Sequence, residues 1–98
     1  MNEAAKLGNQ VKIGENCSIG FCTIADFVEI GRGVVIEDNA YIGTRAKISS
    51  GCIVGSNARI ESQVVLGKGV IVETGAVIKA KSKIPAGSII KGNGKSIL

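Results

Sequence analysis

Aliphatic residues recur along this chain at intervals of six. From residue 24 onward the series has no gap, and its members are Ile24, Ile30, Ile36, Ile42, Ile48, Val54, Ile60, Leu66, Val72, Ile78, Ile84 and Ile90. Leu7, Ile13 and Ile19 show the same spacing one residue out of phase, so the unit 19–23 contains five residues. A period this short and this regular predicts a β-helix.

A second set of inward positions supports this prediction. Four residues after the aliphatic positions stand Val28, Val34, Ala40, Ala46, Cys52, Ala58, Val64, Val70, Ala76, Ser82 and Ser88. Because successive side chains on a strand point in opposite directions, both sets face one interior. Each unit is then a short strand followed by a bend, and three units close one triangular coil. We therefore predict an all-β fold, a single-stranded parallel β-helix that forms one domain over residues 1–98. Its five coils are expected at 7–23, 24–41, 42–59, 60–77 and 78–95.

The bends sort into three columns when the coil period is 18 residues. One corner carries Gly33, Gly51, Gly69 and Gly87. The next carries Asn39, Asn57, Gly75 and Asn93. Gly and Asn tolerate a left-handed backbone at little cost, so both corners are expected to use that conformation. The third corner lacks this preference, and we expect it to turn differently; its residues are Phe27, Arg45, Gln63 and Lys81.

The outward position just before each aliphatic residue differs among the three walls. One wall carries Glu29, Lys47, Val65 and Lys83. Another carries Tyr41, Arg59, Val77 and Lys95. The remaining wall is an unbroken aliphatic ladder of Val35, Ile53, Ile71 and Ile89. A contiguous aliphatic stripe indicates an interface, and β-propensity alone would not make one wall uniform. We predict that this ladder is a self-association surface.

Composition and charge narrow the classes of function. The net charge is +4, but the lysines are scattered and aromatic residues make up only 3% of the chain, so we expect no nucleic-acid partner. Lysines become denser near the end, at Lys79, Lys81, Lys83, Lys91 and Lys95. Glu61 with Lys79, and Glu73 with Lys91, should pair across coils.

No apolar run approaches the roughly 20 residues of a membrane span, and the first residues contain no signal core. We therefore expect no membrane partner and a cytoplasmic location.

Cysteine and histidine usage limits the chemistry. The three cysteines have no CxxC spacing and predict neither a zinc site nor a disulfide framework. Cys17 and Cys52 fall in an inward column two coils apart, whereas Cys22 lies at the bend of the shortened unit, where we expect it to be exposed. The chain has no histidine, so we expect no metal and no histidine general base.

From Leu7 to its end the chain resembles the hexapeptide-repeat acyltransferase family. Units such as IGTRAK at 42–47 carry the resemblance, which is most specific in GAVI at 75–78 and IPAGSIIKGN at 84–93. The family continues Gly-Asn with Pro, where this chain has Gly94. The resemblance implies a left-handed coil, although parallel crossovers are otherwise right-handed. It also implies a homotrimer with roughly parallel prism axes.

The same resemblance implies acetyl-CoA or another acyl-CoA as co-substrate, bound in a groove between neighbouring prisms. By this resemblance Gly75 and Ala76 line the groove, while Lys79, Lys81 and Lys91 contact phosphate.

Two functions remain open at this point. The first is a CoA-dependent acyltransferase or acetyltransferase acting on an amino sugar or another small amine or hydroxyl acceptor. Most members of the family use a histidine base, but a neutral amine is already nucleophilic, so Asn57, Ser50 or Glu61 would only need to orient it. The second is a catalytically inactive β-helix that serves as a scaffold or interaction module. The closing motif and its lysines favour an enzyme, whereas the missing histidine and the absence of long loops favour the scaffold.

Overall fold

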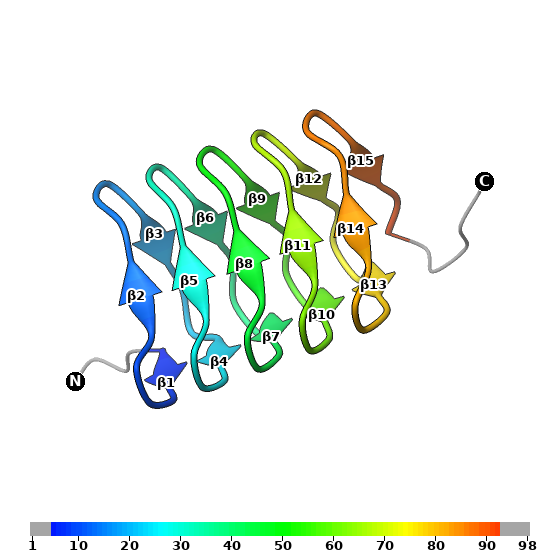
Figure 1. Ribbon diagram of the computed structural model, residues 1–98. Coiled ribbons are helices and arrows are strands. Elements are labelled where there is room, and N and C mark those ends of the chain that lie inside the picture. Colours follow the sequence, from blue (N-terminus) through cyan, green and yellow to red (C-terminus); the bar gives the residue numbers. More distant parts are fainter. Residues whose placement is uncertain (1–4, 93–98) are drawn as a thin grey trace.

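A computed structural model describes residues 5–92 as fifteen two-residue strands, which alternate among three parallel sheets (Figure 1). Sheet A contains β1 (Lys6–Leu7), β4 (Thr23–Ile24), β7 (Tyr41–Ile42), β10 (Arg59–Ile60) and β13 (Val77–Ile78). Sheet B contains β2 (Lys12–Ile13), β5 (Glu29–Ile30), β8 (Lys47–Ile48), β11 (Val65–Leu66) and β14 (Lys83–Ile84). Sheet C contains β3 (Ser18–Ile19), β6 (Val35–Ile36), β9 (Ile53–Val54), β12 (Ile71–Val72) and β15 (Ile89–Ile90). The predicted all-β fold of about five coils is confirmed, and the structure describes the last coil as far as residue 92.

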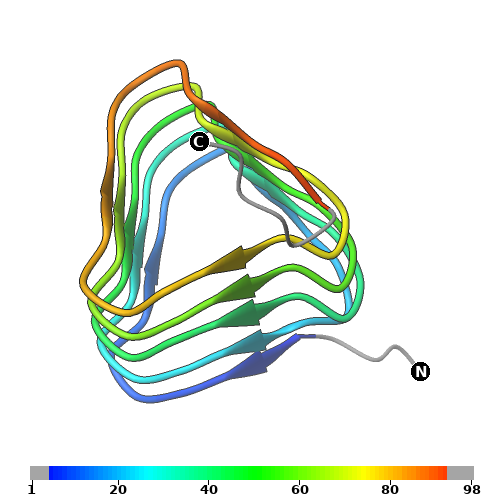
Figure 2. The same cartoon turned by 90° about the vertical axis from the view of Figure 1, so that its right-hand side faces the viewer.

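The strand register confirms the period and its single interruption. Arg59 pairs with Tyr41 on one side and Val77 on the other, which are steps of one full coil. Lys6 pairs with Thr23, one residue short of that step, as the five-residue unit requires. Seen from the C-terminal end, the chain runs clockwise as it approaches the viewer, so the coil is left-handed (Figure 2). Within residues 5–92, no helix is long and apolar enough to cross a membrane.

Outside the shortened unit 19–23, all three corners of the triangle turn through a residue with positive φ. We name each corner by the two sheets it joins. At the AB corner Phe27, Arg45, Gln63 and Lys81 have φ of 63°, 64°, 62° and 66°. These values match Gly33 (66°) at the BC corner and Asn39 (67°) at the CA corner. The expectation that the AB corner turns differently is wrong, because a triangular coil with equal sides needs equal bends, whichever residue occupies them. Asn93 lies outside the described residues.

Side-chain stacking offsets part of the cost of these bends. A non-glycine residue in this conformation costs about 1–2 kcal/mol. The Arg45 guanidinium carbon lies 4.8 Å from the centroid of the Phe27 ring one coil earlier. Such a cation–π contact contributes about 0.5–1 kcal/mol at an exposed site. The corner therefore tolerates large residues when they stack on one another.

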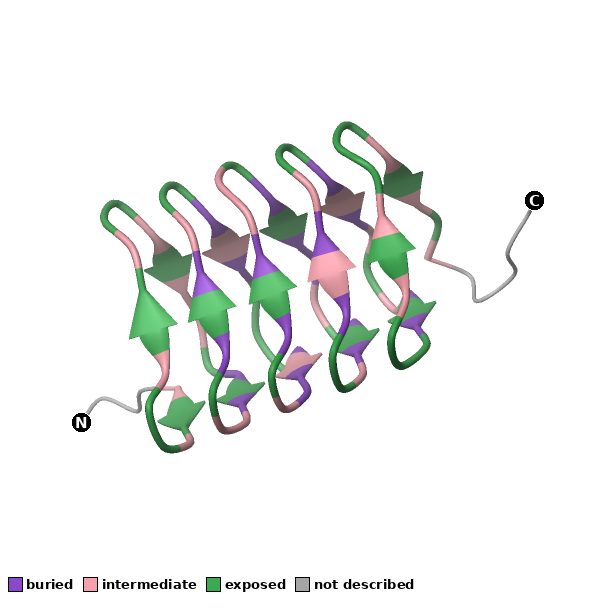
Figure 3. Cartoon of the chain, viewed as in Figure 1, coloured by how far each residue is buried: buried purple, intermediate pink, exposed green. Residues whose placement is uncertain are grey.

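The interior is a continuous apolar column (Figure 3). Every predicted inward position from Ile24 to Ile78 is buried, whereas Leu7 at the N-terminal end is 52% exposed. Cys22 is also buried, contrary to expectation. Since Thr23 pairs with Tyr41, Cys22 lies level with Ala40 and continues its inward column. The shortened unit has lost a residue from its bend, and the strand has kept its inward side chain.

Ion pairs between coils agree with expectation in part. Lys91 Nζ lies 3.8 Å from Glu73 Oε2, which confirms the predicted pair. In the described part of the chain, Glu61 and Lys79 form no pair within 4.0 Å, while Lys47 Nζ lies 3.9 Å from Glu29 Oε1. All of these side chains are solvated and contribute little stability. Lys95 lies outside the described residues.

Glycines occupy two kinds of position in the coil, and substitutions should distinguish the two kinds. A Cβ on Gly43 would lie 2.6 Å from the Glu61 carbonyl carbon, whereas a Cβ on Gly33 would meet nothing within 4 Å. We expect Gly43→Ala and Gly43→Asn each to lower the free energy of unfolding by about 1–3 kcal/mol, because the next coil must move away. Gly33→Asn should be nearly neutral, since Asn tolerates positive φ.

Urea denaturation at fixed protein concentration measures both effects. If Gly33→Asn lowered the free energy of unfolding as much as Gly43→Asn, the loss at both sites would come from the backbone conformation and not from contact with the next coil.

Candidate functional site

The aliphatic ladder lies on sheet C, as the sequence predicts. Val35 pairs with Ile53, Ile53 with Ile71, and Ile71 with Ile89, so the four side chains form one row down the prism. Ile53 is 38% and Ile89 54% exposed, and the other two are partly covered. A continuous row of exposed aliphatic side chains is a surface that association would remove from water.

A shallow groove runs beside this ladder along the CA corner. One depression of about 420 Å³ is lined by Glu37, Ile53, Gly55, Ile71, Val72, Glu73, Thr74 and Gly92. A second of about 410 Å³ is lined by Ser18, Ile19, Gly20, Val35, Ile36, Glu37, Asp38 and Ser56. Because Glu37 lines both, they adjoin, and together we call them the sheet C groove. Gly55 forms part of its floor, where a Cβ would lie 2.7 Å from the Thr74 nitrogen.

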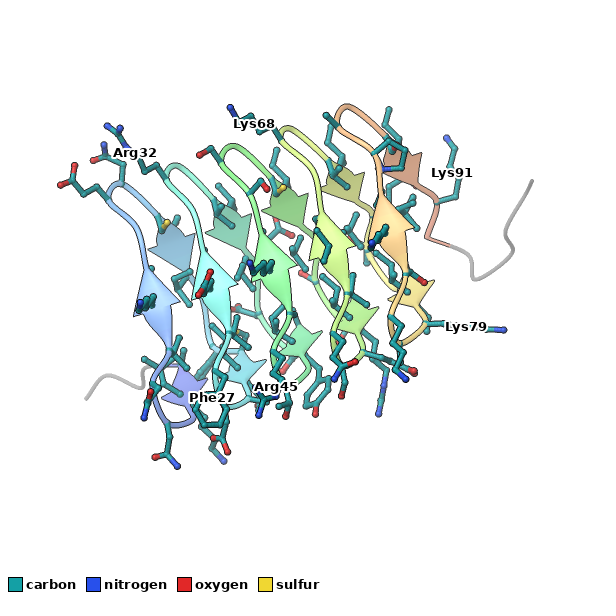
Figure 4. All side chains as sticks on the ribbon, in the orientation of Figure 1. Phe27, Arg32, Arg45, Lys68, Lys79 and Lys91 are labelled. Atoms are coloured by element: carbon teal, nitrogen blue, oxygen red, sulfur yellow. The ribbon has the colours of Figure 1, made fainter. Side chains whose placement is uncertain are left out.

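The two corners that flank sheet C carry opposite charges. At the CA corner Glu37 Oε1 accepts a hydrogen bond from Ser56 Oγ at 3.3 Å. Glu73 Oε1 accepts one from the Gly92 amide at 3.2 Å. The BC corner instead extends Arg32 and Lys68 into solvent (Figure 4). On the coils 24–41 and 60–77 sheet C therefore lies between an acidic edge and a basic edge, whereas Glu15 on the first coil adds a negative charge to the BC corner and Lys91 on the last coil adds a positive charge to the CA corner.

The residues suggested for acyl-CoA binding separate into three groups. Gly75 (φ 76°) is half-buried at the CA corner, close to the groove. Ala76 is fully buried, and its amide donates to the Glu73 carbonyl at 3.0 Å, so it presents neither a side chain nor a free N–H. Lys91 lies at the C-terminal end of the groove and pairs with Glu73. Lys79 and Lys81 are exposed at the AB corner, with no carboxylate within 4.0 Å in the described part of the chain.

The three candidate catalytic residues lie at three different corners. Ser50 is half-buried at the BC corner, Asn57 is exposed at the CA corner, and Glu61 is half-buried at the AB corner. Within one prism the structure does not bring them together. Ser50 and Asn57 do share the coil 42–59, so they lie at the same height along the axis.

The buried cysteines are packing residues. Cys52 Sγ donates to the Gly67 carbonyl at 3.1 Å. Burial raises the pKa of the Cys22 and Cys52 thiols, so both stay protonated near neutral pH and are poor nucleophiles. Among residues 5–92, no three His, Cys, Asp or Glu side chains are grouped as a metal site.

Sequence reasoning missed the sheet C groove. Its signal was present in one column, where Glu37, Gly55 and Glu73 follow one another at the coil period. A glycine between two carboxylates on successive coils indicates a surface depression with a carboxylate on each side.

Comparison with known proteins places the chain in a family. Residues 1–86 match the family model described as the GMPPB C-terminal domain. The chain is 40% identical over 55 residues to 2,3,4,5-tetrahydropyridine-2,6-dicarboxylate N-succinyltransferase of Methylorubrum populi, a match that covers 53% of this chain and 20% of that protein. It is 44% identical over 59 residues to the bifunctional protein GlmU of Marinobacter nauticus, covering 55% of this chain and 13% of that protein. The matches thus span about a fifth or less of these curated relatives.

Solved structures share the architecture at lower identity. Serine acetyltransferase (CysE) of Neisseria gonorrhoeae superposes with a TM-score of 0.76 at 19% identity, over 90% of this chain and 38% of that one. The acetyltransferase domain of PglB from Neisseria gonorrhoeae superposes with a TM-score of 0.66 at 22% identity, over 95% of this chain and 54% of that one. These likenesses show the fold. The chain belongs to the GMPPB C-terminal domain family, and its left-handed coil of six-residue units is a fold that it shares with hexapeptide-repeat acyltransferases.

Proposed function

We propose that this chain is the β-helical domain of a CoA-dependent acyltransferase that works as a homotrimer, with the acyl donor bound between prisms. The observation that carries this proposal is the sheet C groove, which adjoins an exposed aliphatic ladder and whose lining residue Glu73 pairs with Lys91. Relatives named as a succinyltransferase and as acetyltransferases support acyl transfer as the class of reaction.

The charges at the corners indicate how the prisms pack. Three prisms with parallel axes close into a ring when the flat sheet of each receives a flanking corner of its neighbour. On the coils 24–41 and 60–77 the CA corner is acidic and the BC corner is basic, so the BC corner is the one that fits beside the sheet C groove. Arg32 and Glu37 belong to the coil 24–41, so in a ring without axial offset they meet at one height. Lys68 and Glu73 repeat this arrangement in the coil 60–77.

The same packing brings two candidate catalytic residues together. Ser50 of one prism comes to the sheet C face of the next, at the height of its Asn57, whereas Glu61 stays on a distant corner. In the proposed reaction the acceptor nitrogen bonds to the acyl carbon, the carbon–sulfur bond breaks, and CoA leaves as a thiol with the proton that the amine loses. Asn57 and Ser50 would hydrogen-bond and orient a neutral small amine such as an amino sugar.

The glycine floor of the groove suits the slender pantetheine arm, because Gly55 and Gly92 let it approach the backbone. At the C-terminal end, Lys91 lies beside the groove through its pair with Glu73, whereas Lys79 and Lys81 lie on the AB corner of the same coil, away from the groove. Ammonium groups of this kind bind phosphates as point charges. We assign the phosphates of CoA to this end of the prism.

Calorimetric titration with acetyl-CoA tests the proposal. We expect saturable binding to the trimer, and about tenfold weaker binding in Lys91→Gln, since one charge-assisted contact at the end of the groove is lost. Lys6→Gln at the opposite end of the prism serves as the control and should leave affinity unchanged.

If the trimer were intact and gave no binding heat, the proposal would be wrong. The interaction module would then be the better description of the chain.

A further inference from the structure

A second groove, separate from sheet C, crosses the N-terminal half of sheet B. One depression of about 390 Å³ is lined by Gln10, Lys12, Phe27, Glu29, Arg45 and Lys47. An adjoining depression of about 350 Å³ is lined by Lys12, Glu29, Ile30, Gly31, Lys47, Ile48 and Ser49. Because Lys12, Glu29 and Lys47 line both, the two form one groove from the AB corner to the BC corner. We call it the sheet B groove.

Positive charge dominates this groove. Lys12, Arg45 and Lys47 contribute three cations, and Glu29 contributes the one carboxylate among its lining residues. Lys47 and Glu29 are paired loosely at 3.9 Å. In the described part of the chain neither Lys12 nor Arg45 has a carboxylate within 4.0 Å. The groove thus has surplus positive charge on two side chains that no internal partner neutralises.

Stacking on Phe27 fixes the orientation of the Arg45 side chain before a ligand binds. Its guanidinium carbon lies 4.8 Å from the Phe27 ring centroid, and the two side chains stack at the AB corner (Figure 4). Stacking occupies one face of the guanidinium and leaves the N–H groups at its edge available to donate. A planar fork fixed in this way matches two oxygens of a phosphate better than a mobile lysine does.

We propose that the sheet B groove binds a phosphoryl anion, a diphosphate or a phosphate ester. Arg45 donates to its oxygens and Lys12 and Lys47 neutralise its charge. The remainder of such a ligand would lie across sheet B toward Gly31 and Ser49, where glycine leaves the surface low and serine supplies a hydroxyl. The groove belongs to the first three coils, whereas the lysine assigned to CoA belongs to the fifth, so the two sites are distinct.

Titration of ¹⁵N-labelled protein with inorganic pyrophosphate tests this site. We expect saturable amide shifts at Lys12, Phe27, Arg45 and Lys47. Adenosine diphosphate distinguishes two sources of the anion, because a nucleotide would add shifts at Gly31 and Ser49 and a simple phosphate ester would not. Shifts confined to Lys79, Lys81 and Lys83, or shifts that do not saturate, would overturn the proposal.

Substitutions separate this site from general surface charge. Arg45→Gln should weaken pyrophosphate binding about tenfold and leave acetyl-CoA binding unchanged. Glu29→Gln should tighten it about threefold, a gain that misfolding does not produce. Arg59→Gln is the matched control, because Arg59 also stacks on an aromatic ring, with its guanidinium carbon 5.3 Å from the Tyr41 centroid, but lies on sheet A. An equal loss in Arg59→Gln and Arg45→Gln would refute a localised site.

Discussion

Replacement of Ile60 by alanine is expected to lower the free energy of unfolding by about 2–5 kcal/mol, the range for a large aliphatic side chain removed from a closed core. Ile60 is fully buried in the central part of the column, between Ile42 and Ile78 on the neighbouring coils. The backbone of three parallel sheets prevents these neighbours from collapsing into the space. The cavity should therefore persist, and its cost should lie toward the upper part of that range.

Leu7→Ala provides the matched control in the same column. Leu7 pairs with Ile24 at the N-terminal end and is 52% exposed, so its truncation should cost about 1 kcal/mol or less. Urea denaturation followed by circular dichroism at one protein concentration measures both variants. Equal losses would mean that the end coil is as tightly covered in solution as the centre. A large loss only for Ile60→Ala would show that coil stability rises inward from the open end.

The core and the walls could be predicted because one rule governs them. An inward aliphatic residue at every sixth position is required by each coil independently, so the series from Ile24 to Ile90 repeats the same signal many times. The aliphatic ladder follows from the same six-residue period, because Ile53 and Ile71 each directly precede an inward residue on successive coils. Stacked repeats make contacts mostly with their neighbours, so local pattern and global fold agree.

Residue preference does not predict the conformation of the AB corner. Arg45 and Gln63 adopt positive φ although neither favours it, since closure of the triangle determines the bend. Cys22 was mispredicted for a related reason. The six-residue spacing from Ile19 places Cys22 at a bend, whereas the pairing of Thr23 with Tyr41 determines its inward orientation. In both cases the geometry of the whole coil overrides the preference of a single residue.

The candidate site was harder to predict because it depends on which polar residues of successive coils share one corner of the triangle. Ser50, Asn57 and Glu61 are polar residues close in sequence, yet they occupy three corners. Conversely, Phe27 and Arg45 are one coil apart and stack directly. Polar positions need no strict period to be tolerated at a surface, so periodicity carries little information about them. Their juxtaposition emerges only when the coil is built.

Conversion of Ile71 to glutamate is expected to dissociate the proposed homotrimer into monomers. Ile71 belongs to the ladder on sheet C, and its side chain points outward, so the substitution leaves the core of the prism intact. A carboxylate buried without a partner at an apolar interface carries a large desolvation penalty. Light scattering on a sizing column should change from three times the 10.0 kDa chain mass to the chain mass itself. Val77→Glu is the matched control, since Val77 is an exposed aliphatic residue on sheet A outside the ladder.

Charge exchange tests whether the BC corner is the surface that packs on sheet C. Arg32→Glu and Glu37→Arg should each raise the dissociation constant of the trimer about tenfold, because each places like charges opposite one another. The two changes together should restore most of the affinity, since the pair is re-formed with its signs exchanged. Glu37 is suited to this test because its one side-chain hydrogen bond in the described structure is the 3.3 Å contact from Ser56. If the double variant dissociated as readily as the sum of the two single changes predicts, the ring would have to close through another corner, and the meeting of Ser50 with Asn57 would be lost with it.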